Sequence, residues 1–321
     1  MGEPLLLALD FGGTKLAAAI AARGERAWRA LERSVSPQEK DARYEYGTML
    51  ALARRLLDGQ TPAAIGVSFG GPVDAARGRV VLSHHVRGWE DTPLRDQLQT
   101  AFGAPVSIDN DANVAALGEY KFGAGQRCAS LLYITVSTGV GGGWVIDGKI
   151  FSGVDGLAGE IGHTIVDPHG PLCLCGRRGC VEIMACGPAI ARAARAQLSA
   201  EPSAGAKLRV LIGNDLDALT TERVSSAANA GDELARAVID AAAHALGFGI
   251  GTAITLMNPA RVVLGGGVTK SGERWWSEVR AAARANTLPQ MRADIVPAAL
   301  GDDAPLWGAI ALAEDLTPEV N

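Results

Sequence analysis

The stretch LLLALDFGGTKLAAAI, residues 5–20, decides the fold class of this chain. Its apolar run LLLAL predicts a short buried strand, and residues 15–22 predict the returning strand of a hairpin across a glycine-rich turn. The same order recurs where the strand SLLYITV, residues 130–136, precedes a glycine-rich turn, residues 137–143, and a return strand, residues 144–146. We therefore expect an architecture that is built twice.

The remainder of the chain alternates strands and helices, which is typical of an α/β fold. The predicted elements are helices at residues 43–57, 112–120, 188–198, 233–255, 273–285 and 305–314 and strands at residues 65–69, 106–108 and 261–264. No long Ser/Pro-rich linker separates the halves, so we expect two α/β domains packed across a cleft. The first domain is predicted in residues 1–117, with the C-terminal helix of residues 305–321 packed back on it, and the larger one in residues 118–304.

Composition excludes several classes of protein. The 321 residues include 30 Lys and Arg against 35 Asp and Glu, without a basic block, so we expect no nucleic-acid partner. The N-terminal segment lacks a basic region, and the most apolar stretch, residues 245–257, contains three glycines and predicts a buried helix. We therefore expect no membrane association and a cytoplasmic protein. The 40 glycines among 321 residues make up about 12% of the chain, against a usual share of about 7%. This excess suggests sharp turns or places where the backbone closely approaches a ligand.

Three glycine clusters follow predicted strands. In DFGGTK, residues 10–15, glycine N–H groups can converge on a phosphate, and Asp10 can reach a hydrated Mg²⁺ ion. The cluster STGVGGG, residues 137–143, repeats this pattern, and a third cluster occupies residues 265–267. Each of them alone could be a plain turn that needs glycine. Three such clusters at strand ends favour a nucleotide-binding site.

The run IDNDAN, residues 108–113, lies at a junction between a strand and a helix. Helix capping is one explanation, because Asp and Asn are preferred N-cap residues. Capping requires only one such residue, however, and the run supplies four polar side chains. A carboxylate here could take a proton from an alcohol, and the amides could bind neighbouring hydroxyls.

The strongest local signal is a cysteine-rich segment that follows GEIGH, residues 159–163. It contains Cys173, Cys175 and Cys180, and with His163 these residues match the ligand set of a closed Cys₃His zinc site. His169 is a competing imidazole, but His163 is favoured because it lies in a strand-like segment that could be pinned to the loop. A site with four protein ligands is structural rather than catalytic.

Taken together, these motifs resemble the ROK family of sugar kinases, which includes bacterial glucokinases and N-acetylhexosamine kinases. The resemblance covers residues 5–307 and rests on DFGGTK, GGPVD, NDAN, TVSTGVGGG, GEIGH, CLCGRRGCVE and VVLGGG in family order. It implies an actin-like ATPase fold, duplicated and ribonuclease H-like, with two domains around a cleft. It also implies ATP, Mg²⁺ and a structural Zn²⁺ as bound groups.

The same resemblance implies roles for individual residues. Asp111 resembles the catalytic base, and Gly71, Asn110, Glu160, His163 and Glu182 resemble sugar-binding residues, with His163 also facing zinc. The residues implied around ATP and its metal are Asp10, Gly12, Gly13, Thr14, Lys15, Thr138, Gly139, Gly265 and Gly266. The segment SHHVRG, residues 83–88, departs from the Asn-Leu-Pro-Gly type segment of many members, so His84 and His85 are not assigned to the site.

We therefore predict an ATP-dependent kinase that phosphorylates a hexose at its 6-hydroxyl, with glucose as the first choice. An N-acetylmannosamine kinase is the close alternative, because residues 163–171, HTIVDPHGP, resemble both groups. A catalytically silent sugar-binding regulator is a third reading, which the intact Asp111 disfavours. The expected partners are the hexose and ATP, in a homo-oligomer that is a dimer or a tetramer.

Overall fold

The computed structural model describes residues 4–13, 15–83 and 85–317. The strands are β1 (Leu5–Phe11), β2 (Lys15–Ala22), β3 (Ala30–Val35), β4 (Ala64–Phe69), β5 (Val73–Asp74), β6 (Arg79–Val80), β7 (Val106–Asn110), β8 (Ser130–Val136), β9 (Val140–Ile146), β10 (Lys149–Ile150), β11 (Arg261–Gly265) and β12 (Asp294–Pro297). The helices are α1 (Ala42–Leu57), α2 (Leu94–Phe102), α3 (Asp111–Phe122), α4 (Val181–Ala185), α5 (Gly187–Ala200), α6 (Ala206–Ile212), α7 (Thr221–Asn229), α8 (Glu233–Met257), α9 (Glu273–Ala285) and α10 (Ala304–Leu316).

The described residues form two compact units. The first unit comprises those in 1–133, 143–158 and 298–321, and the second comprises those in 134–142 and 159–297. The first two unit borders along the chain therefore fall within strands β8 and β9. The domain boundary after residue 117 that the sequence suggests stays a prediction.

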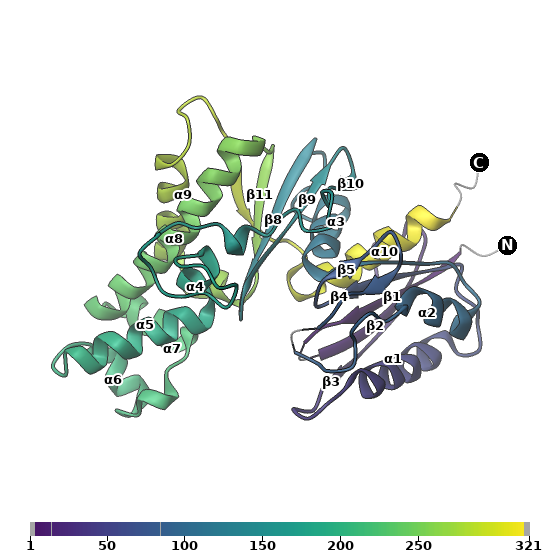
Figure 1. The fold of residues 1–321 in the computed structure, drawn as a ribbon, viewed down its shortest axis with the longest axis horizontal. Coiled ribbons are helices and arrows are strands. Elements are labelled where there is room, and N and C mark those ends of the chain that lie inside the picture. The colour runs from purple at the N-terminus through teal and green to yellow at the C-terminus, as the bar shows by residue number, and fades with distance from the viewer. Residues whose placement is uncertain (1–3, 14, 84, 318–321) are drawn as a thin grey trace. The chain divides into compact units, whose positions relative to one another are not determined.

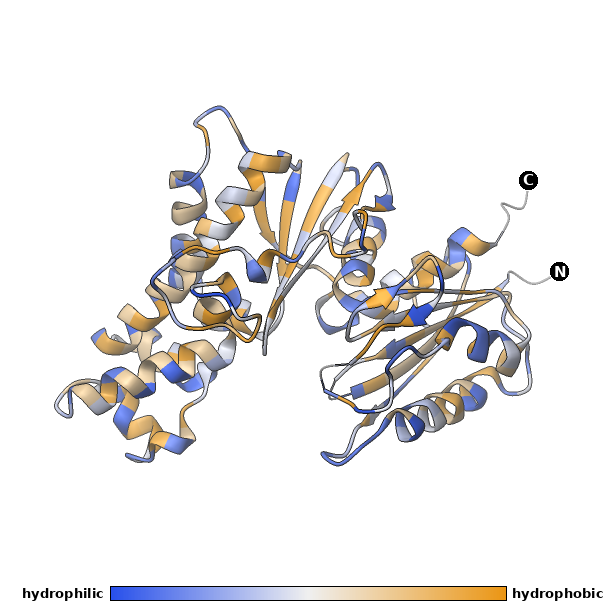
Figure 2. Ribbon diagram, viewed as in Figure 1, coloured by the Kyte–Doolittle hydropathy of each residue, from blue (hydrophilic) through white to orange (hydrophobic). Residues whose placement is uncertain are grey.

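Two five-stranded sheets share one strand order. The first sheet is ordered β3-β2-β1-β4-β7 and the second β10-β9-β8-β11-β12, so each runs 3-2-1-4-5 in its own set of strands. In the first sheet, β1 pairs antiparallel with β2 and parallel with β4. Figure 2 shows mainly hydrophobic residues along β8 and β11, as expected for central strands. The repeated order agrees with the duplicated architecture that the glycine-turn hairpins predict.

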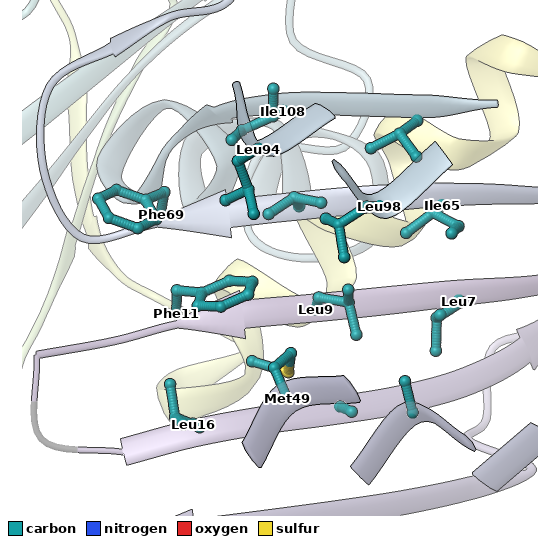
Figure 3. Close-up of a cluster of buried hydrophobic side chains, with 14 of the residues drawn as sticks. Leu7, Leu9, Phe11, Leu16, Met49, Ile65, Phe69, Leu94, Leu98 and Ile108 are labelled. Atoms are coloured by element: carbon teal, nitrogen blue, oxygen red, sulfur yellow. The ribbon is translucent and has the colours of Figure 1, made fainter. Parts of the chain in front are cut away.

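Both faces of the first sheet are buried. Successive side chains of a strand point to opposite faces, so Leu7, Leu9 and Phe11 of β1 share one face. On that face they join Met49 of α1 and Leu94 and Leu98 of α2 in one apolar cluster (Figure 3). Leu6 and Ala8 lie on the other face, in a cluster with residues of α3 and α10. Asp10 is two positions beyond Ala8 in β1, so its side chain lies on the same face as Leu6 and Ala8, which is the face where α3 begins.

Helix α10 packs directly on the backbone of its neighbours. An ideal Cβ on Gly308 would lie only 1.7 Å from the carbonyl oxygen of Val114 in α3. A Cβ on Gly66 of β4 would lie 1.7 Å from the carbonyl oxygen of Ala309. Glycine at these positions lets α10 approach α3 and β4 closely, and the C-terminal helix thereby completes the first unit (Figure 1).

Helix α8 forms the centre of the helical part of the second unit. It packs against α9, α7, α4 and α5 (Figure 1). Its length and composition would be enough to cross a membrane, but 61% of its most apolar window is buried inside the protein. Residues 245–257, predicted as part of a buried helix, form its C-terminal half.

Two local predictions were wrong. Strand β9 begins at Val140, so the turn after β8 is shorter than predicted and Gly143 lies within the strand. A Cβ on Gly143 would be 2.7 Å from the Ala112 carbonyl oxygen, so close approach of the backbone explains the glycine there. His163 ends a 3₁₀ helix, Ile161–His163, rather than lying in a strand. A Cβ on Gly162 would be 2.0 Å from the carbonyl oxygen of Val140, so close backbone approach explains the glycine there.

Candidate active site

Asp10 is held near the carboxyl end of β1, opposite Ser68 of β4. The Ser68 hydroxyl donates a hydrogen bond of 2.8 Å to Asp10 Oδ1. Burial raises the pKa of Asp10 to about 7, with a further contribution from the nearby Asp111 carboxylate. A bound cation would favour the charged form of such a carboxylate. Asp10 is thus suited to hold a hydrated Mg²⁺ ion, directly or through water.

The turn after β1 has little space for side chains. A Cβ on Gly12 would lie 2.9 Å from the Lys15 carbonyl oxygen, and a Cβ on Gly13 would lie 3.4 Å from Cδ2 of His85. Thr14 lies outside the described residues. Lys15 begins β2, and its exposed Nζ is 3.9 Å from the exposed carboxylate of Asp302. The structure therefore places the Lys15 ammonium in a surface ion pair.

The polar run at the start of α3 divides into structural and candidate catalytic residues. Asn110 caps the helix, because its Oδ1 accepts a hydrogen bond of 2.9 Å from the Ala112 N–H. Its Nδ2 donates a hydrogen bond of 3.1 Å to the carbonyl oxygen of Gly71, and this bond joins the polar run to the turn after β4. Asp109 is buried, and its Oδ1 accepts from the Asn110 N–H at 2.7 Å and from Asn113 Nδ2 at 3.0 Å.

Asp111 is the first residue of α3, where helix N–H groups favour a negative charge. Its Oδ1 accepts a hydrogen bond of 2.8 Å from the Ala112 N–H. Its Oδ2 lies 3.8 Å from the position that a Cβ on Gly70 would take, so glycine at 70 leaves room beside the carboxylate. The first unit thus brings Asp10, Asn110, Asp111 and the turns at Gly12 and Gly71 into one neighbourhood.

In the second unit, Glu182 supports the turn that follows β8. Its Oε2 accepts a hydrogen bond of 3.0 Å from the Val140 N–H and would lie 2.7 Å from a Cβ on Gly139. Glu182 is therefore tied to the turn that carries Thr138. The sequence predicts only a sugar contact for Glu182, and this second connection follows from the fold.

A cavity of 310 Å³ opens beside the same turn. Thr138 lines it together with the N-terminal ends of α5 and α7 and the start of the 3₁₀ helix after β11. Its lining residues are Ser137, Thr138, Gly187, Pro188, Ala191, Leu219, Thr220, Thr221, Glu222, Gly267 and Val268. Helix N-termini and a glycine turn around one cavity are suited to an anionic, nucleotide-like ligand.

The third glycine cluster lies at the end of β11. Gly265 is the last residue of the strand, and Gly266 has a φ of +89°, which favours glycine. A Cβ on Gly266 would lie 2.4 Å from the carbonyl oxygen of Val136. The backbone therefore passes directly over the end of β8, next to the cavity that Gly267 lines.

His163 faces two groups with its two ring nitrogens. Its Nε2 is 4.0 Å from Oε2 of Glu160, whose side chain is 55% exposed. Its Nδ1 is 3.9 Å from Sγ of Cys173. One nitrogen can therefore bind a metal while the other faces Glu160. The dual role that the resemblance implies for His163 stays a prediction.

The side chains of His163, Cys173, Cys175 and Cys180 form one cluster. Their ligand atoms all lie within 4.8 Å of one another, and Sγ of Cys175 is 3.5 Å from Sγ of Cys180. Tetrahedral Zn²⁺ with bonds of about 2.0–2.3 Å requires ligand atoms to be roughly 3.5–3.8 Å apart, so the cluster fits this ion. The backbone N–H of Arg177 lowers the pKa of Cys175 to about 6, whereas burial raises the pKa of Cys180 to about 12. His169 is exposed and is not part of the cluster.

Sequence reasoning missed two groups of residues. Ser68 lies in no recognisable motif, although pairing of the first and second parallel strands would have placed it opposite Asp10. The cavity residues of α5 and of 219–222 carry no recognisable pattern, because they converge only through the packing of separate helices.

Comparison with known proteins places this architecture in a family. The family model of the ROK family matches residues 6–316. A glucokinase from Halalkalibacterium halodurans is 36% identical over 317 residues, with 96% of this chain and 94% of that protein covered. An N-acetylmannosamine kinase from Shigella boydii serotype 18 is also 36% identical, over 310 residues, with coverage of 96% and 98%.

Solved structures give the same result. The ROK family glucokinase from Streptomyces griseus, in complex with glucose and AMPPNP, has a TM-score of 0.82 and 34% sequence identity. The match covers 97% of this chain and 99% of that one. The predicted α/β fold of the actin-like ATPase type is therefore confirmed. Because the family model and these relatives match nearly the whole chain, the protein belongs to the ROK family.

Proposed function

We propose that this protein is an ATP-dependent sugar kinase that phosphorylates the 6-hydroxyl of a hexose, with glucose as the preferred substrate. The observation that carries the proposal is the carboxylate pair of the first unit, in which Asp111 begins α3 and the neighbouring Asp10 has a pKa raised to about 7. The relationship to glucokinases over nearly the whole chain supports it.

Asp111 is proposed as the general base. Phosphoryl transfer depends mainly on positioning and charge neutralisation, and the protein must also accept the hydroxyl proton. Asp111 lies at a helix N-terminus, where helix N–H groups favour a negative charge, and its carboxylate can take that proton. Asn110, Gly71, Glu160, His163 and Glu182 are proposed to bind the other parts of the sugar.

ATP is proposed to bind at the glycine turns. The residues proposed for the phosphates in the first unit are Gly12, Gly13, Thr14 and Lys15, whose ammonium would have to leave the ion pair with Asp302. Those proposed in the second unit are Thr138, Gly139, Gly265 and Gly266. The cavity of 310 Å³ beside Thr138 would take the nucleoside. Asp10 would hold the Mg²⁺ ion that neutralises phosphate charge. The Cys₃His cluster would hold a structural Zn²⁺ and set the position of His163.

A second substrate is favoured by a specific observation. The N-acetylmannosamine kinase relative is as similar in sequence as the first glucokinase, at 36% identity. An N-acetyl group needs an apolar recess for its methyl, whereas the proposed sugar-binding residues are all polar or glycine, namely Gly71, Asn110, Asp111, Glu160, His163 and Glu182. We therefore keep glucose first. We further propose that the enzyme is a cytoplasmic homo-oligomer, a dimer or a tetramer.

A substrate panel tests the proposal. ADP release with Mg²⁺ and ATP would be coupled to a dehydrogenase, and kcat/KM measured for glucose, mannose, fructose, N-acetylglucosamine and N-acetylmannosamine. We expect glucose to give the highest value, because a site built on hydroxyl pairing rejects an analogue that leaves its groups unpaired. A clear preference for N-acetylmannosamine would overturn the choice of sugar. Sugar binding without turnover of any substrate would indicate a silent regulator instead.

A further inference from the structure

A buried lysine contacts the first glycine turn. The side chain of Lys40 is only 7% exposed although it carries a charge. Its Nζ donates a hydrogen bond to the carbonyl oxygen of Gly13 and lies 3.7 Å from Oε1 of Glu45. Removing two opposite charges from water is costly even when they attract each other. The placement of this pair beside a proposed phosphate-binding turn therefore suggests a role beyond stability.

Glu45 is itself fixed by the core of the first unit. It lies in the first turn of α1, is 3% exposed, and its Oε2 accepts a hydrogen bond of 2.9 Å from Nε1 of Trp89. The Trp89 ring makes edge contacts with Phe11 and Phe69, at centroid distances of 5.5 Å and 5.1 Å. Figure 3 shows these two phenylalanines at the ends of β1 and β4, directly before the two glycine turns.

These contacts form a connected series from the sheet to the turn. The sheet positions Trp89, Trp89 positions Glu45, and Glu45 holds the ammonium of Lys40 next to the Gly13 carbonyl. A hydrogen bond that holds the Gly13 carbonyl restricts the backbone torsions of that glycine, which are otherwise unusually free, and so limits where the Gly13 N–H points. An anion is bound by N–H groups and repelled by carbonyl oxygens. A hydrogen bond to the Gly13 carbonyl therefore controls which groups of the turn are presented to a phosphate.

We propose that Lys40 is a positioning residue for the phosphoryl donor. It holds the carbonyl of Gly13 so that the N–H groups of the turn are arranged for the ATP phosphates before ATP binds. The assignment rests on the proposed kinase function. Preorganisation of this kind strengthens ATP binding, because the free energy of binding is no longer reduced by the cost of ordering the turn. Sugar binding, at the start of α3, does not depend on this contact.

Substitution of Lys40 separates this role from a merely stabilising one. Lys40→Met removes the positive charge and the N–H groups that donate hydrogen bonds, whereas Lys40→Arg keeps both. Lys149→Met changes an exposed lysine of β10 and serves as a matched control. We expect Lys40→Met to raise the KM for Mg–ATP about tenfold or more, with the KM for glucose changed less than about twofold. Lys40→Arg should recover part of the loss, and the control should behave like the wild type.

Hydrogen exchange provides a readout that does not depend on activity. Peptides covering residues 9–16 should exchange faster in Lys40→Met than in the wild type or in Lys149→Met. If the wild type transfers phosphate to no sugar, the proposed function fails, and the exchange data still decide whether Lys40 orders the turn. Wild-type KM for Mg–ATP and wild-type exchange in folded Lys40→Met would overturn the assignment.

A second variant covers the case in which Lys40→Met does not fold. Glu45→Gln keeps the size of the side chain but removes the carboxylate charge that orients the ammonium. We expect a smaller rise in the KM for Mg–ATP and faster exchange of the same peptides. No change in either quantity would reject the role of Lys40.

Discussion

Consecutive polar residues at the end of β7 and the start of α3 have different roles. Asn110 caps the helix and binds the Gly71 carbonyl, and Asp109 is buried with two hydrogen-bond donors. Asp111 lies next to Asp10 at the helix N-terminus. Residue type alone does not separate these roles, since aspartate serves in two of them. The packing of β7 against β4 decides which carboxylate is buried.

The role of Asp111 can be tested by a change that keeps its shape. Asp111→Asn removes the proton acceptor, so we expect kcat to fall by roughly 10²- to 10⁴-fold. Sugar affinity, measured by calorimetry, should remain close to that of the wild type. Asp315→Asn, at an exposed ion pair with Lys121, serves as the control and should not change kcat. Near-normal turnover of Asp111→Asn would refute the assignment of the base.

At the scale of elements, the proposed zinc site makes a prediction about the stability of the cysteine-rich loop. We expect native mass spectrometry to find one Zn²⁺ ion per chain. Cys175→Ser should lose the ion and unfold at a lower temperature, because metal binding is coupled to folding of the loop. Cys128→Ser changes a cysteine outside the cluster and should keep the ion. Full zinc occupancy in Cys175→Ser, or none in the wild type, would contradict the proposed site.

The contact of α10 with α3 makes a different prediction. Gly308→Ala would place a Cβ 1.7 Å from the Val114 carbonyl oxygen, so we expect a loss of about 1–3 kcal/mol in the free energy of unfolding. Gly47 of α1 has no atom within 4 Å of an added Cβ. Gly47→Ala should therefore stabilise the protein by about 0.5–1 kcal/mol. Urea unfolding measures both changes, and equal stability of the two variants would show that α10 is not packed this closely.

At the scale of the whole molecule, the candidate site residues are divided between the two units. The proposed base Asp111 and the proposed Mg²⁺ ligand Asp10 belong to the first unit, whereas Thr138, the Cys₃His cluster and the cavity belong to the second. The proposed kinase function therefore requires both units. The repeated 3-2-1-4-5 strand order explains how one chain can present a glycine turn from each unit.

The sequence by itself determined the α/β class, the duplicated hairpins and the candidate metal ligands His163, Cys173, Cys175 and Cys180, because strand periodicity, glycine turns and ligand spacing are local properties. Its resemblance to the ROK family also predicted the family that the comparisons confirm. Only the tertiary structure decided the partners of Asp10 and Glu182, the 3₁₀ helix at His163, the cavity beside Thr138 and the buried contact of Lys40 with Gly13. These features join residues that are far apart in the chain, so they depend on burial and packing rather than on local pattern.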